Sequence, residues 1–212
     1  YFMNHIENLV ERYSLLESCK EDIEQAYACL ATCYSNNGKV LVCGNGGSCA
    51  DAEHIVGELM KGFCKKRPLS AKLVENIENI NPEQGTYIAN MLECGLSAIA
   101  LSAHTALNTA FANDKDADLI YAQEVMGYGQ SKDVFWGIST SGNSKNVIYA
   151  MQVAKAIGLK TIALTGRDGG KLAQLSDISI IVPSHETYQI QELHLPIYHT
   201  LCLMLEDTFF EK

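Results

Sequence analysis

The sequence predicts an α/β fold with a doubly wound, five-stranded parallel sheet. Short runs of consecutive apolar residues alternate along the chain with longer segments of helical periodicity. Strands that are apolar at every position are covered on both faces, and their alternation with helices is typical of parallel sheets. The length of 212 residues suits one domain, and a hydrophobic content of 47% excludes a disordered chain.

The order of the elements follows from the same patterns. Residues 1–37 read as two N-terminal helices, because they contain neither proline nor glycine. Strands are predicted at 39–43, 97–101, 133–138, 160–165 and 178–182, and helices at 48–60, 105–127, 144–157, 169–175 and 190–210. We expect the flavodoxin-like strand order 2-1-3-4-5, which makes the first and third strands neighbours.

One stretch interrupts this alternation. Residues 69–96 contain no clear strand and only a weak helical signal near 83–93. We interpret them as an insertion, either a lid or a packing element, within a single domain that spans 1–212. The sequence assigns them no function.

Charge and composition exclude several classes of partner. The chain has 16 Lys and Arg residues against 25 Asp and Glu residues, a net charge of −9, without a sizeable basic block. A nucleic-acid partner is therefore not expected. No apolar stretch approaches the roughly 20 residues of a membrane-spanning helix, so no membrane partner is expected. The eight cysteines are scattered without a Cys-x-x-Cys pair, which predicts reduced thiols and a cytoplasmic location.

Two loops rich in glycine and serine follow the first and third predicted strands. The first is Gly-Asn-Gly-Gly-Ser at 44–48, and the second is Ser-Thr-Ser-Gly-Asn-Ser at 139–144. Each leads directly into a helix, whose N-terminus carries partial positive charge and free N–H groups. Such loops bind phosphate without lysine or arginine, although they can also serve simply as turns and helix caps. If the first and third strands are neighbours, both loops line one crevice.

A second group of polar residues is of the kind that binds metal ions. His54 and Glu58 are four residues apart on one helical face. Near the C-terminus, Gln191 is accompanied by two candidate histidines, His194 and His199, and spacing does not choose between them. On a straight helix Gln191 and His199 lie roughly 12 Å apart, too far for one ion.

Two arrangements would remove that difficulty. Pro196 is best tolerated in the first turn of a helix, so Gln191 could lie in the approach to the helix and fold back. Alternatively, the ligands come from different subunits. Asn113 and Asp114, between the second and third strands, could reach the crevice or could form a turn.

These motifs together resemble the sugar-isomerase (SIS) domain of the phosphoheptose isomerase family. The first loop, the segment Asp-Ala-x-His at 51–54 and Glu58-Leu resemble its first half. The segments at 137–144, 162–170 and 190–194, followed by His199, resemble its second half. The likeness covers most of 1–68 and nearly all of 97–212.

The resemblance implies a specific activity and a specific site. It implies a homotetramer with zinc, active sites at subunit interfaces, and conversion of sedoheptulose 7-phosphate through an enediolate. It makes Glu58 and His199 the acid–base pair and implies four zinc ligands, which are His54, Glu58, Gln191 and His199. The implied substrate-binding residues are Asn45, Gly46, Gly47, Ser48, Asn113, Asp114, Ser139, Thr140, Ser141, Ser144 and Gln191.

The chain departs from the family pattern in three places. Lys61-Gly62 stands where the family commonly has Gly-Arg, Gln189 replaces a frequent arginine, and residues 69–96 are additional. Two alternatives stay open for this reason: an isomerase of another phosphosugar, and a non-catalytic SIS protein that binds the bacterial replication initiator. A further question concerns Glu58, because a zinc-bound carboxylate would be a weakened base.

Overall fold

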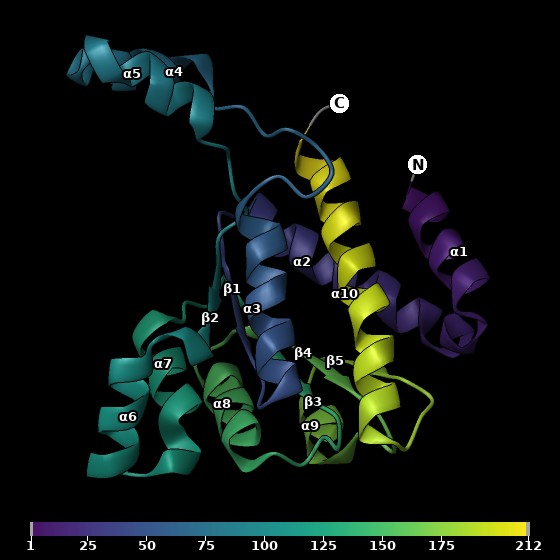
Figure 1. Cartoon of the computed structure of the whole chain (residues 1–212). Coiled ribbons are helices and arrows are strands. Elements are labelled where there is room, and N and C mark those ends of the chain that lie inside the picture. The colour runs from purple at the N-terminus through teal and green to yellow at the C-terminus, as the bar shows by residue number, and fades with distance from the viewer. Residues whose placement is uncertain (1, 211–212) are drawn as a thin grey trace.

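The computed structural model describes residues 2–210 as a parallel sheet with helices on both faces (Figure 1). The strands are β1 (Val40–Cys43), β2 (Ala98–Ala100), β3 (Val134–Ser139), β4 (Lys160–Thr165) and β5 (Ile178–Ile181). The helices are α1 (Phe2–Arg12), α2 (Lys20–Ser35), α3 (Gly47–Met60), α4 (Ala71–Ile80), α5 (Pro82–Met91), α6 (Thr105–Asp114), α7 (Ile120–Tyr128), α8 (Lys145–Ala156), α9 (Gly170–Leu175) and α10 (Thr187–Phe209). The strand order β2-β1-β3-β4-β5 confirms the predicted fold class.

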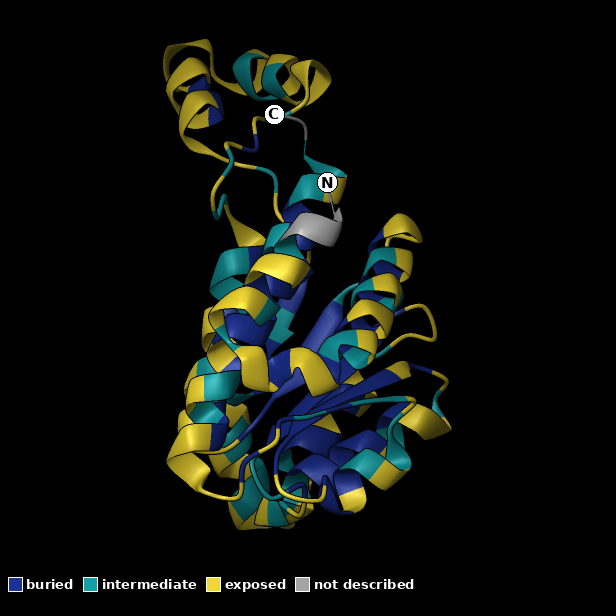
Figure 2. Ribbon diagram, turned by 90° about the vertical axis from the view of Figure 1, so that its right-hand side faces the viewer, coloured by how far each residue is buried: buried dark blue, intermediate teal, exposed yellow. Residues whose placement is uncertain are grey.

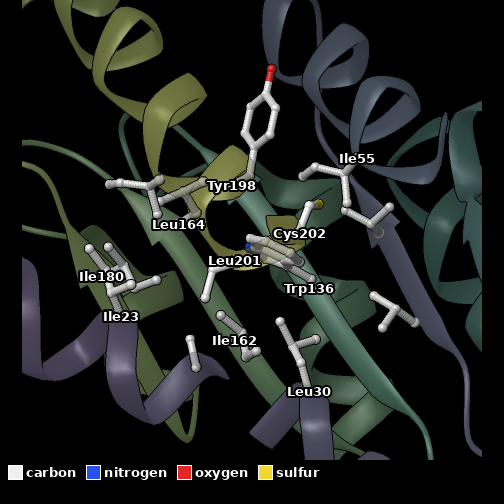
Figure 3. Close-up of a cluster of buried hydrophobic side chains, with 14 of the residues drawn as sticks. Ile23, Leu30, Ile55, Trp136, Ile162, Leu164, Ile180, Tyr198, Leu201 and Cys202 are labelled. Carbon is white, nitrogen blue, oxygen red and sulfur yellow. The ribbon is translucent and has the colours of Figure 1, made fainter. Parts of the chain in front are cut away.

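Two apolar clusters, one on each face, hold the helices to the sheet. Alternate residues of a strand point to opposite faces, so Val40 and Val42 join one cluster while Leu41 and Cys43 join the other. The first cluster packs α1, α2, α3 and α10 on the sheet, and Figure 3 shows part of it around Trp136. The second packs α7, α8 and α9.

The long C-terminal helix corrects one expectation. Pro196 lies inside α10, which begins at Thr187, and so does not mark the first turn of the helix. An interior proline costs roughly 3 kcal/mol in an isolated helix. Here the helix continues because its apolar face, with Ile190, Ile197 and Leu201, is buried in the first cluster. Gln191 therefore does not fold back over a helix start.

The helix predicted at 105–127 is also interrupted. It consists of α6, a short 3-10 helix (Ala117–Leu119) and α7. The side chain of Asp116 accepts a hydrogen bond from the N–H of Asp118, which caps the 3-10 helix. Asp and Asn favour such caps because their side chains compete with helical hydrogen bonds.

The inserted segment forms a helical hairpin of α4 and α5. It projects from the body beside the end of α3, as Figures 1 and 2 show. Ser70 caps α4, and Asn81 caps α5 ahead of Pro82. The helix α4 was not predicted, although Leu73, Ile77 and Ile80 stand at helical spacing behind the Ser70 cap.

A buried ion pair fixes the loop between α3 and this hairpin. The carboxylate of Glu206 in α10 accepts hydrogen bonds from the N–H groups of Phe63, Cys64 and Lys65, and it pairs with Arg67 at 2.9 Å. Arg67 also donates to the carbonyls of Glu58 and Leu59. This network ties the C-terminal end of α3 to α10.

Within residues 2–210, no helix is both long enough and apolar enough to cross a membrane. All eight cysteines are free thiols.

Candidate active site

The two glycine- and serine-rich loops lie at the same edge of the sheet. The first follows β1 and the second follows β3, and these strands pair directly in parallel. The side-chain amides of Asn45 in the first loop and Asn146 at the start of α8 exchange two hydrogen bonds, of 2.8 and 2.9 Å. The loops therefore lie side by side at the carboxyl ends of the strands, where ligands bind in open α/β sheets.

Polar donors gather where these loops enter α3 and α8. The hydroxyl oxygens of Ser139 and Ser144 lie 3.0 Å apart, and Ser48 is buried in the first turn of α3. Gly142 has a φ of +63°, and a Cβ atom there would collide with the carbonyl oxygen of Gly169. Only glycine fits this turn, within which the N–H of Gly142 donates to the carbonyl of Ser139.

A cavity of about 390 Å³ adjoins the second loop. Ser141 and Asn143 line it together with Arg167, Asp168 and His185 from the loops after β4 and β5. A larger cavity of about 520 Å³ lies at the opposite end of the sheet, where β3, β4 and β5 begin. Of these two cavities, the smaller one is continuous with the predicted phosphate loop.

Three of the predicted acid–base and metal residues meet between α3 and α10. The Nε2 atom of His54 is 3.1 Å from Oε1 of Glu58 and 3.5 Å from Nε2 of His199. The Glu58 side chain is only 14% exposed, and its Oε2 atom is buried without a hydrogen-bond partner. The Nζ atom of Lys61 is 3.5 Å from that oxygen. An acceptor-rich cluster of this kind can hold a proton or a metal ion.

Burial and charge lower the affinity of His199 for a proton. Its partial burial lowers the pKa of His199, and the neighbouring His54 lowers it further, while Glu58 acts in the opposite direction. A neutral His199 can accept a proton or bind a metal ion near neutral pH.

The structure separates the two histidines that the sequence left open. His194 is fully buried, and its Nε2 atom hydrogen-bonds to the carbonyl of Thr165 in β4. Burial lowers the pKa of His194 to about 4. It faces the sheet, whereas His199 faces His54, so His199 is the histidine that reaches the cluster.

Comparisons with known proteins identify the family of the chain. The sequence profile of the SIS domain matches residues 1–94 and 76–166. The chain is 41% identical over 211 residues to the phosphoheptose isomerase of a Helicobacter pylori strain, covering 100% of this chain and 95% of that protein. It is 39% identical over 212 residues to the phosphoheptose isomerase of a Nitratiruptor species, covering 98% and 100%. The chain belongs to the phosphoheptose isomerase family.

Solved structures of the family have the same fold over nearly the whole chain. The phosphoheptose isomerase of Neisseria gonorrhoeae superposes with a TM-score of 0.73 at 34% identity, covering 97% of this chain and 94% of that one. The enzyme of Francisella tularensis gives a TM-score of 0.75 at 32% identity, covering 95% and 94%. The family resemblance predicted from the motifs is thereby confirmed.

The zinc ion that the family resemblance implies has suitable donors here but no assembled centre. Among the described residues, no group of three or more His, Cys, Asp or Glu side chains is arranged to hold a metal ion. The Nε2 atom of His54 nevertheless lies 3.1 Å from Oε1 of Glu58 and 3.5 Å from Nε2 of His199. Both distances are close to the roughly 3.3 Å that separates two ligand atoms around tetrahedral zinc. The Oε2 atom of Glu58 is buried and accepts no hydrogen bond. Together, these imidazole nitrogens and carboxylate oxygens are donor types that fit a zinc site.

The remaining predicted residues lie outside this cluster. Gln191 packs against Gly47 at the start of α3, where a Cβ atom on Gly47 would collide with its side-chain amide. Asn113 and Asp114 are exposed at the end of α6, where the Asn113 amide donates to Asp114 at 2.9 Å. In the part of the chain that the structure describes, their side chains make no hydrogen bond with either loop.

Sequence reasoning gave no role to four residues that support the site. The hydroxyl of Tyr121 in α7 donates to the carbonyl of Gly44 and approaches Oδ1 of Asn45. Asn146 links the two loops. The hydroxyl of Tyr198 lies within hydrogen-bond distance of Nδ1 of His54 and donates to Asp51. Asp51 stands three residues before His54, and that helical spacing could have revealed it. No local signal connects Tyr121 with the first loop.

Proposed function

We propose that this chain interconverts sedoheptulose 7-phosphate and D-glycero-D-manno-heptose 7-phosphate. Two observations carry the proposal: the cluster of His54, Glu58 and His199 between α3 and α10, and the pairing of the two glycine- and serine-rich loops through Asn45 and Asn146. The high identity to phosphoheptose isomerases over the whole chain supports the same reaction. Because Glu58 lies roughly 15 Å along α3 from Ser48, the loops and the cluster that act on one sugar would come from neighbouring subunits.

The phosphate group would be held by neutral donors. Ser139, Thr140, Ser141 and Ser144 would supply hydroxyl groups, and the N-termini of α3 and α8 would supply N–H groups and partial positive charge. Gly46 and Gly47 allow the backbone to approach the ligand closely. Asn45, Ser48, Asn113, Asp114 and Gln191 would contact the sugar or its phosphate. Such binding, remote from the reacting carbons, positions C1 and C2.

Glu58 and His199 would move the protons. The carboxylate of Glu58 would remove the proton from the carbon next to the carbonyl group and return it to the neighbouring carbon. His199 would exchange a proton with the carbonyl and hydroxyl oxygens. Isomerisation needs both functions together with stabilisation of the enediolate.

Zinc would complete this site. His54, Glu58 and His199 of one subunit would hold the ion, and Gln191 of a neighbouring subunit would be the fourth ligand, because the continuous helix α10 keeps Gln191 and His199 of one chain roughly 12 Å apart. A bound zinc ion supplies a Lewis acid that stabilises negative charge on the enediolate oxygens. We also propose a cytoplasmic homo-oligomer, with the tetramer that the family resemblance implies as the expected assembly. Large apolar side chains exposed on the hairpin, such as Ile80, Tyr87 and Met91, are available for contacts between subunits.

A panel of ketose phosphates tests this function. Purified protein is incubated with sedoheptulose 7-phosphate and with pentose and hexose ketose phosphates, before and after treatment with a chelator and again after zinc is restored. We expect preferential conversion of the heptose phosphate, loss of turnover with the chelator and recovery with zinc. Preferential conversion of another sugar would reject the substrate, and full activity after complete metal removal would reject the zinc requirement.

A further inference from the structure

A reciprocal pair of side-chain amides joins the two glycine- and serine-rich loops. Nδ2 of Asn45 donates to Oδ1 of Asn146 at 2.8 Å, and Nδ2 of Asn146 donates to Oδ1 of Asn45 at 2.9 Å. Asn45 belongs to the first loop, and Asn146 lies in the first turn of α8, directly after the second loop. The side chain of Asn45 is therefore held by a residue from the far side of the crossover between β1 and β3.

A backbone contact fixes which way these amides face. The N–H of Val147 donates to Oδ1 of Asn146 at 3.0 Å. This N–H lies in the first turn of α8, where a helix has no carbonyl partners of its own for its N–H groups. An Asn146 amide turned by 180° would place its NH₂ group against that donor. Oδ1 of Asn146 therefore stays at Val147, and its Nδ2 faces the oxygen of Asn45.

A buried tyrosine approaches the same oxygen of Asn45. The hydroxyl of Tyr121 in α7 donates to the carbonyl of Gly44 at 2.8 Å and lies 3.2 Å from Oδ1 of Asn45. Its single proton thus lies between two acceptors of the first loop. The ring of Tyr121 is buried in the second apolar cluster, so packing fixes the position of this hydroxyl.

The count of donors and acceptors leaves Asn45 with one free group. Its oxygen has two lone pairs, which face Asn146 and Tyr121. One of the two N–H groups on its Nδ2 is bonded to Asn146, so one N–H group remains. Asn45 is exposed, and this N–H group is accessible to a ligand. In this state Asn45 donates a hydrogen bond to a ligand but offers it no acceptor.

We propose that Asn146 and Tyr121 are positioning residues that hold Asn45 as a hydrogen-bond donor to an acceptor oxygen of the sugar phosphate. The role toward the substrate rests on the proposed function, whereas the fixed amide is a property of the protein without ligand. An ionised phosphoryl oxygen, which only accepts, matches such a donor. Asn146 and Tyr121 act on the ligand through Asn45.

The first experiment needs no ligand. The side-chain amide of Asn45 is assigned in ¹⁵N-labelled protein through the Asn45→Ala variant, and its ¹⁵N relaxation is measured by NMR. We expect this amide to be as rigid as the backbone around it in the unsubstituted protein, and more mobile in Asn146→Ala and in Tyr121→Phe. The matched control is Tyr128→Phe, which removes a hydroxyl of the same helix that lies 3.3 Å from Nε2 of His104. The same mobility of the Asn45 amide in every folded variant would overturn the proposal.

The second experiment tests whether both residues act through Asn45. KM and kcat are measured for the ketose phosphate that the protein converts. Asn45→Ala should raise KM about 10-fold or more, as expected for one hydrogen bond to a charged group, and leave kcat within about twofold. Asn146→Ala and Tyr121→Phe should each raise KM about 3-fold. Neither change should raise KM further when Asn45 is already alanine, whereas a merely structural role would persist there.

Inorganic phosphate supplies a measurement that does not depend on the reaction. Its binding is followed by titration calorimetry in the unsubstituted protein and in Asn45→Ala. Weaker phosphate binding would support donation to a phosphoryl oxygen, and unchanged phosphate binding with a raised KM would support donation to a sugar oxygen. Unchanged values of both quantities, or full effects of Asn146→Ala and Tyr121→Phe in the Asn45→Ala background, would overturn the proposal. If the protein converts no ketose phosphate, the proposed function is wrong, while relaxation and phosphate binding still decide the role of Asn45.

Discussion

At the scale of single residues, the surroundings of Glu58 account for its proposed role. The side chain is mostly buried, one oxygen contacts His54, and the other has no hydrogen-bond partner. Arg67 fixes the backbone carbonyl of Glu58 at 3.1 Å and so holds the end of α3 in place. Glu58 is therefore a mostly buried carboxylate with one oxygen that accepts no hydrogen bond and lies 3.5 Å from the Nζ atom of Lys61.

Replacing Glu58 with glutamine tests the base. The amide cannot take up a proton, so we expect kcat to fall about 100-fold or more, which is the lower range for loss of a general base. The matched control is Glu53→Gln on the same helix, where the side chain is exposed and bonds to Ser102. Near-normal turnover of Glu58→Gln would show that another group removes the proton.

The buried His194 predicts a pH dependence of stability. Its pKa is about 4 in the folded protein, below the ordinary value of 6.5. Between these values the unfolded chain binds a proton that the folded chain does not, so the free energy of unfolding falls as the pH falls. The contribution is about 2 kcal/mol at pH 5 relative to pH 8.

Urea unfolding at pH 8 and pH 5 measures this contribution. His194→Gln should lose about 2 kcal/mol less than the unsubstituted protein between the two pH values, whatever its stability at pH 8. The exposed His185→Gln serves as control and should lose as much as the unsubstituted protein. Equal losses in His194→Gln and the unsubstituted protein would contradict the assignment.

Sequence spacing could predict only part of this residue-level geometry. The pair His54 and Glu58 was predictable because residues four apart share a helical face. The choice of His199 over His194 depends on which face of α10 meets β4, where Thr165 binds His194. The position of Gln191 against Gly47 likewise depends on how α3 and α10 pack. These contacts join residues far apart in the chain and have no local signal.

At the scale of elements, α3 and α10 carry the acid–base residues, and Glu206 fixes their relative position. Its carboxylate is 1% exposed and binds three backbone N–H groups as well as Arg67. Removing one partner of a buried pair leaves an uncompensated charge.

Glu206→Gln should therefore lower the free energy of unfolding by about 3 kcal/mol or more in urea denaturation. The control Glu192→Gln changes an exposed residue of the same helix and should stay within about 0.5 kcal/mol. A loss below about 1 kcal/mol in Glu206→Gln would show that the network contributes little to the fold.

The elements differ in how well the sequence predicts them. The strands were predictable because continuous apolar runs are needed in a sheet covered on both faces. The C-terminal helix, predicted at 190–210, runs from Thr187 to Phe209. Only the suggested place of Pro196 in its first turn was wrong, because burial of Ile197 and Leu201 stabilises a helix that continues through the proline. The helix α4 could have been predicted, because Leu73, Ile77 and Ile80 follow the Ser70 cap at helical spacing.

At the scale of the whole molecule, the sheet forms the body and the hairpin of α4 and α5 is an addition to it (Figure 2). The helix α4 contains no buried residue, and the two buried residues of α5 are Gly85 and Ala89. The contacts at the base of the hairpin, including Glu93 with the N–H of Gly62, lie outside the helices.

Replacing residues 71–91 with a short linker of glycine and serine should leave the body folded. We expect its free energy of unfolding to change by less than about 1 kcal/mol, because few buried contacts are lost. Circular dichroism should show reduced helical signal with the same cooperative transition. Loss of that transition would show that the hairpin is part of the folding core.

Proton transfer in the crevice is tested most directly by isotope exchange. Sedoheptulose 7-phosphate is incubated with the protein in deuterated water, and the aldose phosphate product is analysed by mass spectrometry and NMR. Transfer through Glu58 predicts deuterium at C2 of the product, and no incorporation above background in Glu58→Gln. Product formed by the unsubstituted protein without any deuterium at C2, or equal incorporation in Glu58→Gln, would contradict an exchangeable carboxylate as the group that moves the proton.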